Sequence, residues 1–189
     1  MLTVSVAASR VEANLEGGRL SCPDCDGRLA PWGHARARRI RGEGRLVPRR
    51  SMCSACSATH VLLPVSCLLR RADSVTVIGA ALLAKAEGVG HRRAAQRVGR
   101  PPGTVRGWCR RIERIAGRVR ASLLAVAAQL GAELELAEPT GSSVGDVVGL
   151  LGALAAASVR RLGPCEPWRL AAAATGGRLL HPTGPPPPG

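Results

Sequence analysis

Two pairs of cysteines are the residues of this sequence whose types and spacing are best suited to chemistry. Cys22 and Cys25 form one Cys-x-x-Cys pair, and Cys53 and Cys56 form a second. Each pair can offer two thiolates from a tight turn whose backbone amides are free to hydrogen-bond the sulfurs. Zn²⁺ takes four ligands tetrahedrally and is satisfied by four thiolates, so the sequence predicts a closed, structural zinc site on these four residues.

The spacing of the cysteines leaves some alternatives to weigh. A redox-active dithiol would require a thioredoxin-like βαβ setting, which this segment lacks. The 27 residues between Cys25 and Cys53 exceed the usual ribbon interval of about 15 to 20, but loop-closure entropy grows only logarithmically with length. His60 lies four residues past Cys56 and could compete as a ligand. A histidine there more often packs or hydrogen-bonds beside the metal ligands, so it is left out of the predicted set.

The segment that must position the cysteines, residues 21–66, has the composition of a small β ribbon. Residues 28–32 and 40–50 are predicted to be strands of a hairpin. Seven arginines fall within fifteen residues of this ribbon, against the single acid Glu43. They are Arg36, Arg38, Arg39, Arg41, Arg45, Arg49 and Arg50. Such a charged face is either simply solvated or contacts phosphates, and the sequence leaves both interpretations open.

A second pattern, in residues 91–110, is typical of a helix-turn-helix. If the first residue of this range is counted as place one, Ala95 falls fifth, Gly99 ninth, Val105 fifteenth and Trp108 eighteenth. Two short helices that cross at a tight turn need a small residue where they touch and a glycine that tolerates the left-handed turn. Bulky apolar groups must fill the wedge beneath them. The alternative is an ordinary helical hairpin with a solvated arginine face.

On the helix-turn-helix interpretation, helix 92–98 crosses the DNA backbone and the helix that begins near Gly103 enters the major groove. The predicted DNA-contacting residues are Arg92, Arg93, Arg100, Thr104, Arg106, Arg110 and Arg111. The positions at the start of the second helix hold Pro101, Pro102 and Gly103, which offer no side-chain donors. Specificity would then depend on Arg106, Arg110 and groove shape, which predicts modest discrimination between sequences.

The charge balance points to a polyanionic partner. The formal net charge is +14, from 26 arginines and one lysine against 13 acidic residues. Proteins that bind RNA or single strands stack bases on aromatic platforms, whereas this chain has no Phe, no Tyr and three scattered Trp. Double-stranded DNA is therefore the expected partner.

Helical patterns flank the predicted turn on both sides. Ser74 can cap a helix that runs from Val75 to Glu87 and supports the helix-turn-helix, so the unit spans residues 74–131. Apolar residues from 105 to 130 recur at a strict period of 3.5 along an extended third helix. This seam predicts either a homodimer through the 105–130 helix or, slightly favoured, packing against a later helix from Val144 to Leu162.

The remaining segments complete the predicted organisation. Residues 1–20 are expected to be a short strand or a loose lead-in, residues 142–178 to be C-terminal helices, and residues 179–189 to be a disordered Pro-rich tail. The whole is a mainly α protein with a small β zinc ribbon: a four-cysteine ribbon, then a helix-turn-helix domain, then a C-terminal helical segment.

The cellular setting is also an expectation from sequence. The start, MLTVSVAASRVE, lacks the charged and apolar regions of a signal peptide. The apolar run from Val147 to Val159 is too short for a membrane span, so no membrane contact is expected. A cytoplasmic, nucleoid-associated location follows, and in that reducing setting paired cysteines favour metal over disulfides.

Three motifs in order, CPDC with CSAC, HVLLP, and AAQRVGRPPGTVRGW, resemble the N-terminal DNA-binding region of bacterial insertion-sequence transposases. They equally resemble small bacterial proteins that retain only this region. The resemblance covers residues 21–114, about half of the chain. It implies zinc on the four cysteines and DNA contact from the helix that carries Thr104, Arg106 and Arg110.

The chain departs from such transposases after the helix-turn-helix. The transposases cut DNA with an acidic triad that holds two metal ions on an RNase H-like domain. Here the later acids are clustered or isolated in a helical pattern; they are Glu133, Glu135, Glu138, Asp146 and Glu166. We therefore expect no enzymatic cleavage, and a duplex-DNA-binding regulator or transposase-derived remnant. The alternative is a protein-interaction adaptor that partners a transposase or the transcription machinery.

Overall fold

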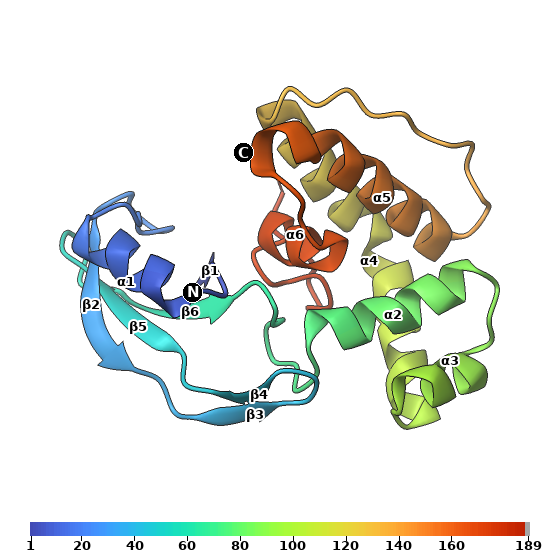
Figure 1. Cartoon of the computed structure of the whole chain (residues 1–189), viewed down its shortest axis with the longest axis horizontal. Coiled ribbons are helices and arrows are strands. Elements are labelled where there is room, and N and C mark those ends of the chain that lie inside the picture. The colour runs from blue at the N-terminus through green and yellow to red at the C-terminus, as the bar shows by residue number, and fades with distance from the viewer. Residues whose placement is uncertain (188–189) are drawn as a thin grey trace.

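The computed structural model describes residues 1–187 of the 189-residue chain. Within that range it contains six helices, a four-stranded mixed sheet and a separate two-stranded hairpin. Figure 1 shows the strands and the first helix on one side of the molecule and the other five helices on the other side. The mainly α architecture with a small β part is confirmed.

The four-stranded sheet has the order β1-β6-β5-β2. Its strands are β1 (Leu2–Val4), β2 (Leu29–His34), β5 (Arg49–Cys53) and β6 (Thr59–Pro64). Strand β1 lies parallel to β6, whereas β5 is antiparallel to both β6 and β2. The sheet therefore brings the segment just after the first cysteine pair beside the strand that ends at Cys53, with Leu29 opposite Cys53.

The expected lead-in of residues 1–20 is wrong in its second half, because residues Ala8–Glu16 form helix α1. Val11 and Leu15 of α1 are buried against Leu29 and Leu62 of the sheet. The helix has no side-chain cap at Ala7 and no acid in its first turn, so the usual signals of a helix start are missing from the sequence.

The predicted single strand over residues 40–50 is also wrong, because this segment is divided between two strands. Strands β3 (Arg38–Ile40) and β4 (Gly44–Leu46) pair with each other, and β5 then pairs with β2. Gly42 and Gly44 have φ of +94° and +98°, which closes the β3–β4 hairpin on itself. Pro48 separates β4 from β5 and has no N–H with which to continue a ladder.

The helical part consists of α2 (Val75–Ala86), α3 (His91–Val98), α4 (Pro102–Gln129), α5 (Ser143–Leu162) and α6 (Pro167–Ala174). Ser74 caps α2 as predicted, since its side chain accepts a hydrogen bond of 3.3 Å from the amide of Val77. Helix α3 ends at Gly99, which has the left-handed φ of 62°.

The apolar seam of α4 is used within the chain. Val105, Ile112, Val119 and Leu123 are fully buried, and α4 packs along α5, whose Leu151 and Leu154 face the same core. Figure 1 shows α4 and α5 running side by side. The intramolecular alternative is therefore the one observed, while pairing with a second copy through the 105–130 helix remains a prediction.

Helix α5 also alters the expectation about membrane spans. It runs over 20 residues, longer than the apolar run recognised in the sequence, and is long and apolar enough to cross a membrane by length and composition alone. Val147, Leu151 and Leu154 lie in the same buried cluster as the apolar residues of α2, α4 and α6, whereas Val159 and Leu162 near its end are exposed. Within the described residues, 44% of the most apolar part of α5 is buried, so one helix of this kind is weak evidence for a membrane span.

The predicted disordered tail is wrong at its start. Leu179 and Leu180 are completely buried in the helical core. They are held there because the amide of Leu69 donates a hydrogen bond of 2.8 Å to the carbonyl of Gly177. The last two residues, 188–189, lie outside the described part of the chain.

Candidate metal centre

The two Cys-x-x-Cys turns have the same backbone geometry. In each turn the residue after the second cysteine is left-handed, with φ of 58° at Asp26 and 59° at Ser57. Each of these residues donates its amide to the carbonyl of the first cysteine, at 2.9 Å to Cys22 and 3.1 Å to Cys53. The two turns have few residues in common besides their cysteines. Their shared backbone geometry therefore goes with the Cys-x-x-Cys spacing, which presents two sulfurs on the same side.

The four sulfurs lie together at a spacing that suits a tetrahedral ion. All four Sγ atoms are within 4.8 Å of one another, with 3.8 Å from Cys22 to Cys56 and 3.5 Å from Cys25 to Cys53. Zn–S bonds of about 2.3 Å in a tetrahedron place the sulfurs about 3.8 Å apart. The predicted ligand set is therefore close enough to hold a metal ion, and its dimensions are compatible with structural zinc.

Thiol chemistry also favours a bound cation. The amides of Cys56 and Ala55 lower the pKa of the Cys53 thiol to about 7. The amide of Gly27 acts in the same direction on Cys25, but the neighbouring Cys56 and Cys53 sulfurs outweigh it and raise the pKa of Cys25 to about 12. Four crowded thiols cannot all ionise without a compensating positive charge, and a divalent ion supplies that charge.

Gly27 is required by the close packing of the two turns. A Cβ at this position would lie 2.7 Å from the Cβ of Ala55 and 2.9 Å from the sulfur of Cys53. Real Cβ atoms do not approach other atoms so closely, so any side chain at residue 27 would push the two turns apart. The site is half buried as a result, with Cys22 and Cys53 fully buried and Cys25 and Cys56 exposed.

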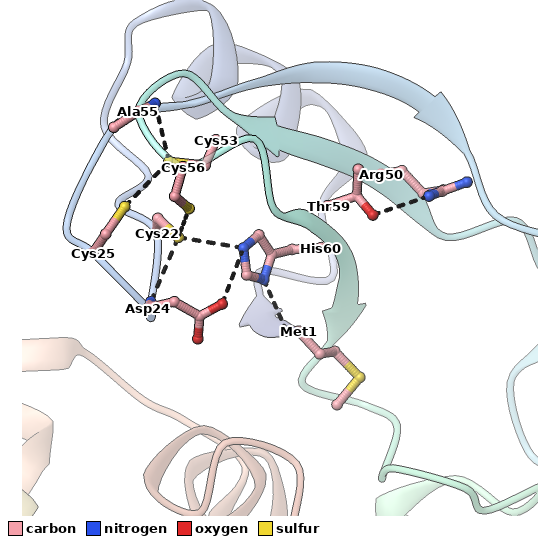
Figure 2. A network of polar contacts seen from close by, with 10 residues as sticks. All are labelled: Met1, Cys22, Asp24, Cys25, Arg50, Cys53, Ala55, Cys56, Thr59 and His60. Carbon is pink, nitrogen blue, oxygen red and sulfur yellow. Dashed lines mark hydrogen bonds and ion pairs between the residues drawn. The ribbon is translucent and has the colours of Figure 1, made fainter.

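His60 is the residue next to the cysteines whose role the sequence left open. Its ring is buried, its Nε2 lies 3.3 Å from the sulfur of Cys22, and its Nδ1 lies 3.0 Å from the amine of Met1 (Figure 2). Burial and the adjacent amine charge lower the pKa of His60, which favours the neutral ring. Since the amine donates to Nδ1, the proton of the neutral ring is on Nε2 and is donated to the Cys22 sulfur.

A second group that could hold a metal, formed by Cys22, Asp24 and His60, shares Cys22 with the four-cysteine group. The four cysteines complete a tetrahedron by themselves, whereas this second group offers only three ligands. His60 is therefore better placed as a hydrogen-bond donor that orients one thiolate than as a ligand.

His60→Ala is expected to lower zinc affinity about 10- to 100-fold, because the Cys22 thiolate loses its donor. A chelator competition assay measures this change. His60→Gln, whose amide N–H can still donate, is the matched control and should retain most of the affinity. Cobalt-substituted protein should keep the absorption of four thiolate ligands in both variants, and a changed ligand-field spectrum would show instead that His60 is a ligand.

The predicted DNA-contacting arginines do not all have the same environment. Arg92 and Arg93 on α3 and Arg106 and Arg110 on α4 are exposed. Arg111 and Thr104 are half buried. Arg100 differs from the others, because its Nε donates to the carboxylate of Asp73 and only 18% of its side chain is exposed, so fewer of its donors are available to DNA.

Asp73 was not singled out by the sequence, although it joins the two parts of the molecule. Its buried carboxylate accepts hydrogen bonds from Arg41 at 2.9 and 2.8 Å and from Arg100. Burial alone would raise the pKa of Asp73, but the two guanidinium groups outweigh it and hold the pKa below its usual value. The ionised carboxylate thus connects the β3–β4 hairpin to the turn between α3 and α4.

Backbone contacts reinforce this connection. The amide of Arg41 donates to the carbonyl of Ala72 at 2.7 Å, and the amide of Ser74 donates to the carbonyl of Arg41 at 2.9 Å. A Cβ on Gly42 would lie 2.6 Å from the hydroxyl of Ser74, so the hairpin touches the start of α2 directly. Figure 1 shows the hairpin reaching from the sheet toward that end of α2.

The fold and the site define a protein in which a ribbon, whose four cysteines lie close enough to hold a metal ion, is fixed against a helical domain. Comparison of the chain with known protein families, with curated proteins and with solved structures finds no match.

Proposed function

We propose that this chain is a duplex-DNA-binding protein in which α3 and α4 act as a helix-turn-helix and a structural zinc ion stabilises the ribbon. Its role would be that of a transcriptional regulator or of a DNA-binding remnant derived from a transposase. The zinc would be bound by four thiolates with no open coordination position, so it would stabilise the fold and take no part in a reaction.

The observation that carries the proposal is the geometry of α3, the turn and α4. Gly99 adopts φ 62° and ψ 43° between the two helices, and α4 begins three residues later. Ala95, Val105 and Trp108 are buried in the angle between them, as a helix-turn-helix requires. At the start of α4, Pro102, Gly103 and Arg106 are exposed, which leaves that side of the helix free to enter a major groove.

The positive charge along α4 also supports duplex DNA as the partner. Four exposed arginines repeat every four residues on one row of this helix: Arg106, Arg110, Arg114 and Arg118. The row extends over about 18 Å, at a rise of about 1.5 Å per residue. Among the described residues no carboxylate forms an ion pair with any of the four. Phosphates of a DNA backbone are suitable partners for such a row.

The β3–β4 hairpin adds positive charge beside the helical unit. Arg38, Arg39 and Arg45 are exposed on it, while Arg41 is occupied by Asp73. Because the hairpin is fixed near the α3–α4 turn, its arginines could contact phosphates of the same duplex. Such contacts would add affinity without sequence information.

Arg106→Ala is expected to weaken binding of the preferred DNA sequence by about 1 to 3 kcal/mol, because Arg106 would lose a contact to a base edge. The preferred sequence comes from selection on genomic fragments, and affinity is then measured by gel shift over a salt series. Arg160→Ala is the matched control, since Arg160 is exposed on α5. Absent or salt-independent binding by the unaltered protein would reject the proposal.

A protein-interaction adaptor is the second candidate, and one surface favours it. Trp32 is 51% exposed on β2, which is the last strand of the four-stranded sheet. An exposed aromatic side chain on an open sheet edge is a common docking surface for another chain. A stable co-purifying protein, together with no retention of DNA, would support this function over DNA binding.

A further inference from the structure

We infer that the proposed DNA interface includes a second phosphate-binding site. It lies where three segments meet: the residues that precede α2, helix α4, and the segment that follows α6. It consists of Arg70, Arg71, Arg111 and Arg178, here called the junction cluster. The inference rests on the proposed function and extends it, because it gives the segment after α6 a role in holding DNA.

Hydrogen bonds between distant segments assemble the junction cluster. The amide of Leu69 donates to the carbonyl of Gly177 at 2.8 Å, so Arg70 and Arg178 each follow one partner of this bond. Two residues further on, Nη2 of Arg71 donates to the carbonyl of Leu180 at 2.7 Å. The C-terminal segment is also tied to α4, because Arg118 donates to the carbonyl of Thr183.

The four arginines are all close enough to act on His181, and Arg111 is also close enough to act on Arg71. Burial lowers the pKa of His181, and the charges of Arg178, Arg70, Arg71 and Arg111 lower it further. The pKa of Arg71 is lowered by burial and by Arg111. The junction cluster is therefore a concentration of positive charge around His181.

Within residues 1–187 no carboxylate neutralises these four charges, since none of the four arginines forms an ion pair with one. In addition, the Nε of Arg71 is buried and has no hydrogen-bond acceptor within the described chain. Guanidinium groups are suited to phosphate oxygens, so a phosphate is a chemically matched partner for the cluster.

The position of Arg111 on α4 favours a phosphate of the DNA backbone over a free anion. Arg111 is five residues after Arg106, which places it about 7.5 Å further along the helix axis and about 140° around it, on the side of α4 that also carries Arg118. The sugar-phosphate backbone borders the major groove, so a helix whose first turns enter the groove carries its following turns to the flanking phosphates. The junction cluster would then contact the strand that borders the groove.

The test is the double variant Arg70→Gln with Arg178→Gln. Arg71 is left in place because it holds the Leu180 carbonyl. The matched control is Arg160→Gln with Arg161→Gln, two exposed arginines in the last turn of α5. The affinity of each protein for its selected duplex is measured over a salt series. Each lost phosphate contact is expected to reduce the slope of log K against log salt by about one, with unchanged sequence preference.

Each outcome decides one proposal. A reduced slope in the double variant alone supports the junction cluster. A slope that is unchanged, or reduced equally in the α5 control, overturns the cluster but leaves the proposed function standing if Arg106→Ala still weakens binding. Failure of the unaltered protein to bind DNA overturns both. The double variant should melt no lower than the unaltered protein, since it removes positive charge from the cluster, and a lysine pair at the same positions should restore the slope.

Discussion

Replacing Cys53 with serine is expected to abolish tight zinc binding and to unfold the ribbon while the helical domain stays folded. Cys53 is the fully buried first cysteine of the second turn, so its loss leaves three sulfurs that cannot complete the tetrahedron. Structural zinc contributes about 10 to 16 kcal/mol of apparent binding free energy in small zinc-dependent folds. Few other contacts in the ribbon could compensate for such a loss.

Separate cores explain why the helical domain should survive. The ribbon residues Leu29, Cys53 and Leu62 form one buried cluster with α1, whereas α2 to α6 surround a different and larger cluster. Zinc content by elemental analysis and hydrogen exchange resolved along the chain measure the two parts independently. Cys165→Ser is the matched control, since that cysteine lies outside the four-sulfur group. Retention of one zinc per chain by the Cys53 variant would contradict the assigned ligand set.

Asp73→Asn is expected to lower the free energy of unfolding of the helical domain with its attached hairpin by about 2 kcal/mol or more, because two guanidinium groups lose their shared carboxylate. Arg100 would be affected most, since it is mostly buried, whereas the side chain of Arg41 is 54% exposed and can turn to water. Urea unfolding measures the change. Glu43→Gln, in the exposed turn of the same hairpin, is the matched control and should have little effect.

The same carboxylate should make stability depend on pH. The pKa of Asp73 is lower in the folded protein than in the unfolded chain. Its contribution is therefore present above the unfolded value of about 3.9 and is lost as the pH falls through the folded value. Unfolding free energies measured from pH 6 downward should fall less steeply in Asp73→Asn, and parallel curves for the variant and the unaltered protein would exclude this contribution.

The cysteine ligands could be predicted from sequence because the chemistry is carried by their spacing. Two Cys-x-x-Cys pairs specify two sulfur-presenting turns whatever strands surround them, and the four sulfurs do lie together. The boundaries of α3 and α4 were similarly predictable, since Gly99 and the two prolines after it mark the turn locally. Signals that depend on a few adjacent residues survive in a single sequence.

Features that depend on distant partners could not be predicted in this way. The sequence around Asp73 shows only an acidic residue next to the helix cap Ser74. Its buried ion pairs arise because Arg41 and Arg100 approach it in the folded protein. In the sequence, Leu179 and Leu180 stand at the start of a Pro-rich tail. In the structure, the hydrogen bond between Leu69 and Gly177 ties this segment to the helical core. Burial of these residues is set by tertiary contacts, on which local composition carries no information.

The carboxylate of Asp73 would also affect how strongly the proposed DNA-binding surfaces act together. Because it holds the arginine-bearing hairpin and the α3–α4 turn in one arrangement, both surfaces would reach a duplex as a single rigid body. Translational and rotational freedom would be lost once for both sets of contacts, and the second set would form at a high effective concentration. A chain with modest contacts on each surface could thereby hold DNA far more tightly than either surface alone.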